Sequence, residues 1–238
     1  DVVLDSGETI QHALKFKDLT QDFVLTSDLY TDLAQLSELP TREYSIASIP
    51  EQRQLNLVVR QQQNEQGELG LGSGWLTQHC AIHSDVLLSL RTNENFHLIE
   101  DDRPIICIGN GTGIAGLLSL LHTRQLRQHH RNWLIWGERH RQTDYFYQTI
   151  LEEWQNDGML QRLDVVFSRD QAEKIYVHHV LRQQATLFKQ WIADDAVIYV
   201  CGSLNGMAGD VDAALVEILG VDAVEELRLH GRYRRDVY

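Results

Sequence analysis

The 238-residue chain is long enough for one large domain or two ordinary ones, and 43% of its residues are hydrophobic, enough to form real cores. Its 34 Asp and Glu residues outnumber its 21 Lys and Arg, and the formal net charge of −13 argues against general binding to the phosphate backbone of nucleic acid. No apolar run approaches the roughly 18 to 20 residues that a membrane-spanning helix needs.

The cysteines indicate the redox environment. Cys80, Cys107 and Cys201 are odd in number and widely spaced, and none forms a Cys-x-x-Cys pair. This usage favours a reducing, cytoplasmic setting. The residues from Asp1 to Gly7 carry no secretory pattern, and the chain opens on Asp rather than Met. We therefore expect part of a longer protein, in which an upstream segment is one route to the cytoplasmic side of a membrane.

The sequence before residue 103 has the character of short strands. Apolar residues come in brief alternating or mixed runs, separated by turn-rich stretches such as the one at 64–74 with its four glycines. Runs at this spacing predict an antiparallel sheet or barrel. The predicted strands are Ala13–Leu19, Asp22–Leu25, Tyr44–Ala47, Gln54–Arg60 and Asp85–Leu90.

After Pro104 the pattern alternates between strand and helix. Such alternation predicts a parallel, doubly wound α/β sheet, so we divide the chain into domains 1–103 and 104–238. The predicted strands are Ile105–Gly109, Asn132–Gly137, Leu163–Phe167 and Ala196–Gly202, and the predicted helices are Thr112–Arg127, Asp144–Gln155, Val177–Trp191 and Met207–Leu219. Four tryptophans are expected in the core of this domain: Trp133, Trp136, Trp154 and Trp191.

A glycine-rich turn lies between the first predicted strand and helix of the second domain, at Gly109-Asn110-Gly111-Thr112-Gly113. Glycines there let the backbone approach a pyrophosphate, and the following helix offers free N–H groups and a partial positive charge. Taken alone, such a turn is as often structural as functional, and the spacing is not G-x-G-x-x-G.

Two further strand ends carry candidate residues. Ser168, Arg169, Lys174 and Tyr176 follow the third predicted strand, where a hydroxyl, a guanidinium and an ammonium would suit the 2′-phosphate of NADPH. The other interpretation is an ordinary polar loop. Cys201 ends the fourth strand and lies either beside a nicotinamide or in the core as a small hydrophobe.

In the first half, Arg42-Glu43-Tyr44-Ser45 combines a guanidinium, a flat aromatic ring and a hydroxyl. Alternation along a strand puts Arg42 and Tyr44 on one face and Ser45 on the other. Together with Gly70-Leu71-Gly72-Ser73, this pattern is suited to a flavin ring and its pyrophosphate.

Taken in order, these motifs resemble the ferredoxin–NADP reductase family, most closely its diflavin branch and within it the flavoprotein subunits of NADPH–sulfite reductases. The resemblance covers roughly residues 40–238. It implies an antiparallel FAD-binding β-barrel followed by a Rossmann-like parallel-sheet domain that binds NADPH. The motifs that carry it are 42–48, 109–115, 132–134, 167–171, 174–177, 198–202, 207–208, 210–211 and the ending Arg232-Tyr233-Arg234-Arg235-Asp236-Val237-Tyr238.

The resemblance also implies roles for particular residues. FAD contacts are implied for Arg42, Glu43, Tyr44, Ser45, Val58, Val59, Arg60, Gly70, Leu71, Gly72 and Ser73. NADPH contacts are implied for Gly111, Thr112, Gly113, Ser168, Arg169, Lys174, Tyr176 and Asp210. The catalytic set is Ser45, Cys201 and Asp236 around the hydride-transfer position, with Tyr238 stacked on the isoalloxazine ring until nicotinamide displaces it.

The activity implied is hydride transfer from NADPH to FAD, followed by electron transfer to a partner. An FMN domain, a hemoprotein and a ferric acceptor remain open as partners. The alternative is a regulatory module that kept the fold and lost turnover. Only about 40 residues precede Arg42, so we expect the helical connecting domain of the diflavin branch to be absent or reduced to Thr26–Leu39, with no flavodoxin domain. No metal site is expected, because adjacent histidines such as His178 and His179 point about 100° apart on a helix.

Overall fold

The computed structural model describes residues 9–10, 14, 17–18, 26 and 28–238, and it divides into two units, Asp1–Glu43 and Tyr44–Tyr238. Most of the predicted strand Ala13–Leu19 and all of Asp22–Leu25 lie outside the described residues. No helix in the described part of the chain has the length and apolar character that crossing a membrane requires.

The first unit contains helix α2, Leu29–Gln35. Its first turn is tied to the preceding chain by Asp32, which is buried and accepts hydrogen bonds from the Thr26 backbone N–H at 2.7 Å and the Thr26 hydroxyl at 2.9 Å. Leu33 and Leu36 are buried in the same unit. This helix falls in the stretch where sequence analysis placed a reduced connecting domain.

The second unit begins with a long segment, 44–104, that has little regular structure. Its helical turns are η1 Pro50–Gln52, α3 Leu71–Gly74 and the π-helix η2 Trp75–His79. The described residues form no strand here: the predicted strands Tyr44–Ala47 and Gln54–Arg60 share one isolated antiparallel bridge, Ile46↔Leu57, and the predicted strand Asp85–Leu90 has none. A second isolated bridge, Gln63↔Leu69, lies outside the predicted strands. The expected antiparallel barrel is therefore not seen in them, because extended backbone becomes a sheet only when a neighbouring strand continues the hydrogen-bond ladder.

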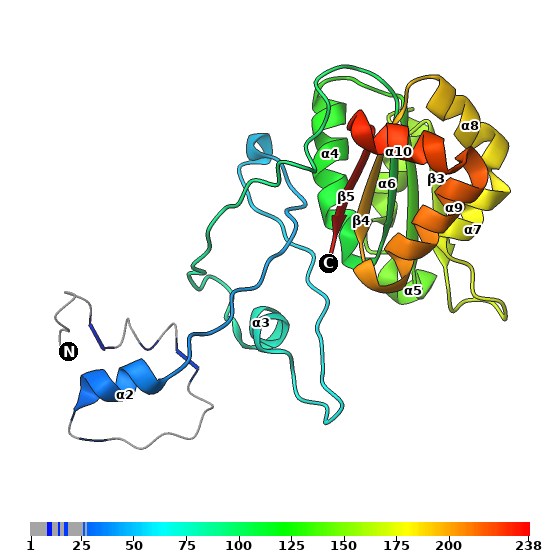
Figure 1. The fold of residues 1–238 in the computed structure, drawn as a ribbon. Helices are drawn as coiled ribbons and strands as arrows, with labels where there is room; N and C mark the ends of the chain where they lie inside the picture. The colour runs from blue at the N-terminus through cyan, green and yellow to red at the C-terminus, as the bar shows by residue number, and fades with distance from the viewer. Residues whose placement is uncertain (1–8, 11–13, 15–16, 19–25, 27) are drawn as a thin grey trace. The chain divides into compact units, whose positions relative to one another are not determined.

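The rest of the second unit is a five-stranded parallel sheet with strand order β3-β2-β1-β4-β5 (Figure 1). All four pairings are parallel, which confirms the predicted sheet. Its central strands are buried on both faces, as expected where helices cover both sides. The strands are β1 Ile105–Asn110, β2 Asn132–Glu138, β3 Arg162–Phe167, β4 Val197–Gly202 and β5 Tyr233–Val237.

Helices cover both faces of this sheet, with α4 on one side and α7, α8 and α9 on the other (Figure 1). Each face of the sheet has its own hydrophobic core, and alternate residues of β1 point into one or the other. Cys107 packs with α4 and α6, whereas Ile106 and Ile108 pack with the helices on the opposite face. The four tryptophans expected in the core are buried. The helices are α4 Ile114–Leu126, α5 Arg141–Asp144, α6 Gln148–Asn156, α7 Val177–Gln183, α8 Ala185–Ala193, α9 Gly209–Leu219 and α10 Val221–Leu229, with the π-helix η4 Leu204–Ala208 before α9.

Two predicted helices are each broken in two. The predicted helix 144–155 breaks at Tyr145, whose φ of −89° and ψ of 55° are not helical and whose ring is buried against Trp136 and Phe167. The predicted helix 177–191 breaks at Gln184. Sequence analysis also did not predict α10 or β5. These differences arise because aromatic packing and edge pairing, rather than local periodicity, decide the backbone there.

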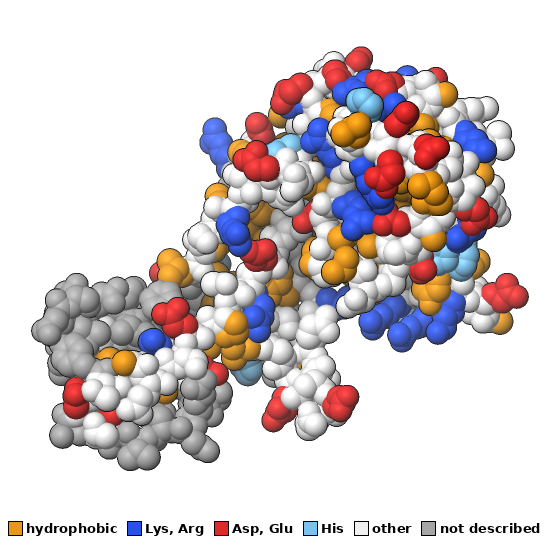
Figure 2. Space-filling model, in the orientation of Figure 1, with side chains coloured by type: hydrophobic (Ala, Val, Ile, Leu, Met, Phe, Trp, Pro, Cys, Tyr) orange, Lys and Arg blue, Asp and Glu red, His pale blue; other side chains and the backbone are white. Residues whose placement is uncertain are grey.

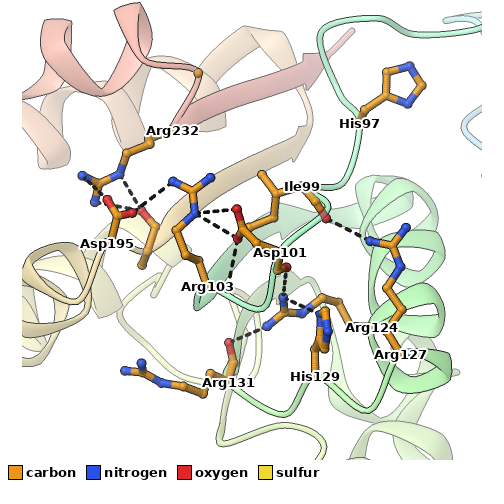
Figure 3. Close-up of polar contacts among 12 residues, drawn as sticks. His97, Ile99, Asp101, Arg103, Arg124, Arg127, His129, Arg131, Asp195 and Arg232 are labelled. Atoms are coloured by element: carbon orange, nitrogen blue, oxygen red, sulfur yellow. Dashed lines mark hydrogen bonds and ion pairs between the residues drawn. The ribbon is translucent and has the colours of Figure 1, made fainter.

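A network of arginines lies at the amino ends of the strands, which we call the amino edge of the sheet (Figure 3). Arg124 is fully buried; its Nε donates to Asn132 Oδ1 at 2.7 Å, and its Nη atoms donate to the carbonyls of Asp101 and Arg131 at 3.4 Å each. Burial lowers the pKa of this guanidinium from its ordinary value. Outside it, Asp195 accepts ion pairs from Arg103 at 3.1 Å and Arg232 at 2.8 Å, which ties the chain before β1 to the start of β5.

We predict that Arg124→Leu lowers the free energy of unfolding by about 1–3 kcal/mol, because it leaves buried acceptors without a donor. Urea denaturation followed by circular dichroism measures this. Arg131→Ala is the matched control: it removes a half-exposed ion pair with Asp194 at the same edge and should change stability by no more than about 0.5 kcal/mol. An Arg124→Leu protein as stable as the control would show that the buried network contributes no net stability.

Candidate functional site

The site lies where the strand order reverses. From β1 the chain crosses to β2 and β3 on one side, and from β4 it crosses to β5 on the other. The carboxyl ends of β1 and β4 therefore lie at the switch point of the sheet, the position where open α/β sheets bind their ligands. The candidate residues of the second unit gather around these ends.

Three positions in the turn after β1 favour or require glycine: 109, 111 and 113. A Cβ on Gly113 would lie 2.1 Å from the carbonyl oxygen of Cys201, and one on Gly109 would lie 2.7 Å from the same oxygen. Gly111 has a φ of +55°, a left-handed conformation that favours glycine. Asn110 secures the other side, since its Oδ1 accepts a hydrogen bond from the Ser203 backbone N–H at 3.0 Å. The turn thus packs directly on β4 and opens into α4.

Beside this turn a polar cluster joins the segment before the sheet to its last strand. The Ser45 hydroxyl donates to Asp236 Oδ2 at 2.9 Å, and the Cys201 thiol lies 3.7 Å from the same oxygen. Asn93 donates to the other oxygen, Oδ1, at 3.0 Å. Burial, followed by the Asp236 charge, raises the pKa of the Cys201 thiol, so the thiol stays protonated. The three residues that the resemblance assigned to the hydride-transfer position are therefore in contact.

The terminal residue lies over the glycine turn. The Tyr238 hydroxyl is 3.1 Å from Thr112 Oγ1, and the Tyr238 backbone N–H donates to the Gly202 carbonyl at 3.0 Å. The side chain is still 57% exposed. Its ring therefore lies against the turn, hydrogen-bonded to Thr112, and remains more than half exposed.

The end of β2 carries a carboxylate that sequence analysis did not single out. The Glu138 side chain is only 1% exposed and pairs with Arg60 from the segment before the sheet, with Nη2 at 2.7 and 2.8 Å from its two oxygens. Trp136, on the same strand, donates its indole N–H to the Gly111 carbonyl at 3.2 Å. In the sequence, Trp136 and Glu138 have only the pattern of residues in a buried strand. The register of the sheet brings them next to the glycine turn after β1.

The ends of β2 and β3 lie side by side. The Ser168 N–H donates to the Glu138 carbonyl at 2.8 Å and the Arg169 N–H to the Arg139 carbonyl at 2.9 Å, which extends the parallel ladder past both strands. Arg139, Arg169 and Lys174 are exposed, and Figure 2 shows Lys and Arg side chains gathered at the molecular edge next to α5. In the described part of the chain, the Arg169 guanidinium has no ion pair or hydrogen bond.

The remaining nucleotide candidates lie at the starts of two neighbouring helices, α7 and α9. Tyr176 precedes α7, is 41% exposed and has its ring 5.7 Å from that of His178. Asp210, at the start of α9, lies 3.5 Å from His178 Nδ1. Burial lowers the pKa of His178, so this pair is a neutral histidine beside a carboxylate near pH 7.

The flavin candidates are only partly brought together. Ser73 Oγ accepts a hydrogen bond from the Gln62 N–H at 3.0 Å, and the Gly70 N–H donates to the Gln62 carbonyl at 2.8 Å. These bonds hold residues 70–73 against the backbone of Gln62. Leu71 is exposed, and Tyr44, Val58 and Val59 are half-buried. Among the described residues, no hydrogen bond joins Gly70, Gly72 or Ser73 to the cluster around Asp236. Arg42 and Glu43 belong to the first unit, in which Arg42 donates to the Thr41 carbonyl at 3.3 Å.

A glycine turn at the switch point of a parallel sheet, with exposed cations after the adjoining strand, defines a dinucleotide-binding domain of the α/β class. Comparison with known proteins agrees: residues 107–213 match the family described as the oxidoreductase NAD-binding domain. This match runs from β1 into α9.

The chain as a whole resembles sulfite reductase (NADPH) flavoprotein alpha-components. It is 38% identical to the protein from Mannheimia succiniciproducens, covering 93% of this chain and 40% of the relative. It is 39% identical to that from Vibrio parahaemolyticus and 37% identical to that from Neisseria meningitidis, covering 90% of this chain in each case and 37% and 38% of the relatives. The chain spans about two fifths of the length of these relatives.

We predict that Gly113→Ala abolishes nucleotide binding and lowers the melting temperature, because its methyl group has no room against the Cys201 carbonyl. Gly209→Ala is the matched control, since a Cβ there would meet nothing within 4 Å. Thermal unfolding and titration with NADP⁺ measure both effects. Normal binding by the Gly113→Ala protein would show that the turn does not need its close contact with β4.

Proposed function

We propose that the chain is the NADPH- and FAD-binding module of a reductase, which takes hydride from NADPH onto FAD and passes the electrons to a partner protein. The observation that carries this proposal is the contact of Ser45, Cys201 and Asp236 at the carboxyl edge of the sheet, beside a glycine turn built for a pyrophosphate. Bound FAD supplies the hydride acceptor and NADPH the donor.

The residues at the edge of the sheet fit a dinucleotide phosphate. The turn Gly111–Gly113 and the start of α4 present backbone N–H groups to the diphosphate. Ser168, Arg169, Lys174 and Tyr176 surround the 2′-phosphate, which supports a preference for NADPH because a guanidinium binds a dianionic phosphate through charge-assisted hydrogen bonds. Asp210 completes the adenosine side of the site.

The chain's own groups prepare the switch point of the sheet for hydride transfer. Asp236 holds the Ser45 hydroxyl and the neutral Cys201 thiol in one cluster, so polar groups are fixed where the nicotinamide ring is proposed to lie. Tyr238 occupies the position proposed for the nicotinamide until the nicotinamide displaces it. Its hydrogen bond to Thr112 has to break during this exchange.

The flavin half of the proposal rests on the first 103 residues. We propose that they belong to an FAD-binding domain of antiparallel β-barrel type and that 104–238 form the NADPH-binding domain. The flavin ring and its diphosphate would then contact Arg42, Glu43, Tyr44, Ser45, Val58, Val59, Arg60, Gly70, Leu71, Gly72 and Ser73.

The electron acceptor is proposed to be a separate protein component. The relatives are named alpha-components of a sulfite reductase, a name that implies at least one further component. A hemoprotein fits this role, and an FMN-containing domain is the other candidate.

The test is a reduction experiment on the FAD-reconstituted chain. We predict a yellow protein with flavin absorbance near about 450 nm that NADPH bleaches under anaerobic conditions, because hydride transfer reduces the flavin. Binding of both cofactors without bleaching would support a regulatory module instead. A colourless protein without nucleotide affinity would refute the proposal altogether.

We predict that Arg169→Ala lowers kcat/KM for NADPH by roughly 10- to 100-fold and leaves NADH within about twofold, because the lost contact is a charge-assisted bond to the 2′-phosphate. Steady-state reduction of ferricyanide with each nucleotide measures the ratio. Arg182→Ala is the control, since Arg182 pairs with Glu217 at 2.7 Å on the α7–α9 surface. An unchanged ratio would move the 2′-phosphate site elsewhere.

A further inference from the structure

The loops that follow β2 and β3 are paired beyond the ends of the two strands. The Ser168 N–H donates to the Glu138 carbonyl at 2.8 Å, where β2 ends. The Arg169 N–H donates to the Arg139 carbonyl at 2.9 Å, past the end of both strands. The next residue along the chain, Asp170, continues this pairing with its side chain in place of its backbone.

Asp170 makes two contacts with the loop after β2. Its Oδ2 accepts a hydrogen bond from the Arg141 backbone N–H at 2.8 Å, and its Oδ1 lies 2.9 Å from His140 Nδ1. The Arg141 N–H, followed by the His140 ring, lowers the pKa of the Asp170 carboxyl from its usual value, so the group is ionised at neutral pH. Each oxygen of this carboxylate therefore has a partner in the neighbouring loop.

The loop that Asp170 holds is itself anchored on the sheet. The Arg141 guanidinium lies over the rings of Tyr145 and Phe167, 5.4 and 5.2 Å from their centroids. Both rings are buried, and Phe167 is the last residue of β3. The Asp170 side chain therefore ties the chain after β3 to a loop whose position is set by the hydrophobic core.

Arg169 lies between Ser168 and Asp170, so its backbone is held on both sides. Its guanidinium is exposed and has neither an ion pair nor a hydrogen bond within the described ranges of the chain. An exposed side chain loses rotamer freedom when it binds a phosphate, and a backbone that is already fixed adds nothing to this entropy cost. The ties made by Asp170 thus favour binding through the side chain of its neighbour.

We propose that Asp170 is a positioning residue for the 2′-phosphate site: it fixes the backbone from which Arg169 reaches the phosphate and does not itself touch the nucleotide. This inference rests on the proposed function and names the residue that sets the preference for NADPH through Arg169. A carboxylate close to a phosphate weakens its binding, since like charges repel. The two contacts with the loop after β2 offset this repulsion by holding the guanidinium within reach.

Three variants separate position from charge. Asp170→Ala removes both contacts, whereas Asp170→Asn keeps an acceptor for the Arg141 N–H and removes only the negative charge. His140→Ala removes one contact from the other loop and leaves the backbone bond in place. Asp157→Ala is the matched control, because Asp157 is an exposed carboxylate that accepts the Met159 N–H at 3.0 Å in the loop before β3.

All variants are studied as FAD-reconstituted full-length chains by isothermal titration calorimetry, with thermal unfolding as a check on folding. The probes are NADP⁺, 2′-AMP, which carries the 2′-phosphate alone, and NAD⁺, which lacks it. Asp170→Ala should weaken binding of NADP⁺ and 2′-AMP about five- to tenfold and leave NAD⁺ within about twofold, because part of a charge-assisted hydrogen bond is lost. His140→Ala should weaken the same two ligands by a smaller factor. Asp170→Asn should bind 2′-AMP at least as tightly as the wild type, and Asp157→Ala should change nothing.

The Arg169→Ala background tests whether Asp170 acts through its neighbour. Adding Asp170→Ala there should change 2′-AMP binding by less than about twofold, because the two substitutions remove the same contact. A full effect in that background, equal weakening of 2′-AMP and NAD⁺, a loss in Asp170→Asn as large as in Asp170→Ala, or no effect of Asp170→Ala would each overturn the proposal. Failure of the wild-type chain to bind either NADP⁺ or 2′-AMP would instead refute the proposed function.

Discussion

The close contact between the β1–α4 turn and the end of β4 is the constraint on which the site depends. Two glycines of the turn lie against one backbone carbonyl, that of Cys201, with no room for a side chain. This contact places the start of α4 at the switch point of the sheet and simultaneously fixes the position of the Cys201 backbone. The nucleotide turn and the polar cluster are therefore two consequences of the same backbone packing.

The cationic side chains at the amino ends of the strands differ in their pairing from those at the carboxyl ends. At the amino edge, the arginines are engaged by carboxylates or carbonyls, as with Arg124, Arg103 and Arg232. At the carboxyl edge, Arg169 and Lys174 are exposed without an ion pair in the described part of the chain. Unpaired cations on a protein with a net charge of −13 concentrate positive potential at one edge, which attracts anionic ligands there.

The last strand returns the chain terminus to the site. β5 pairs with β4 in parallel, with Asp236 opposite Cys201 and Val237 opposite Gly202. This register brings the Asp236 carboxylate next to Ser45, 191 residues earlier in the chain, and leaves Tyr238 above the glycine turn. A shift of one residue would turn Asp236 to the other face of the sheet, so the edge strand determines whether the cluster forms.

The sequence by itself determined the α/β half of this protein: the alternation of apolar strands and amphipathic helices after Pro104 predicted β1 to β4, and the glycines after β1 predicted the turn, because both are local patterns. The ordered motifs also named the family and the residues Ser45, Cys201 and Asp236. Local patterns did not predict the structure where a residue's contacts are with residues far away in the sequence. The runs Tyr44–Ala47 and Gln54–Arg60 have strand composition, yet they share only one isolated bridge because no neighbouring strand continues the ladder among the described residues. Asn93, Trp136 and Glu138 reach the site only through packing and register, and the pairing of Glu138 with Arg60 spans 78 residues, a contact that only the tertiary structure decides.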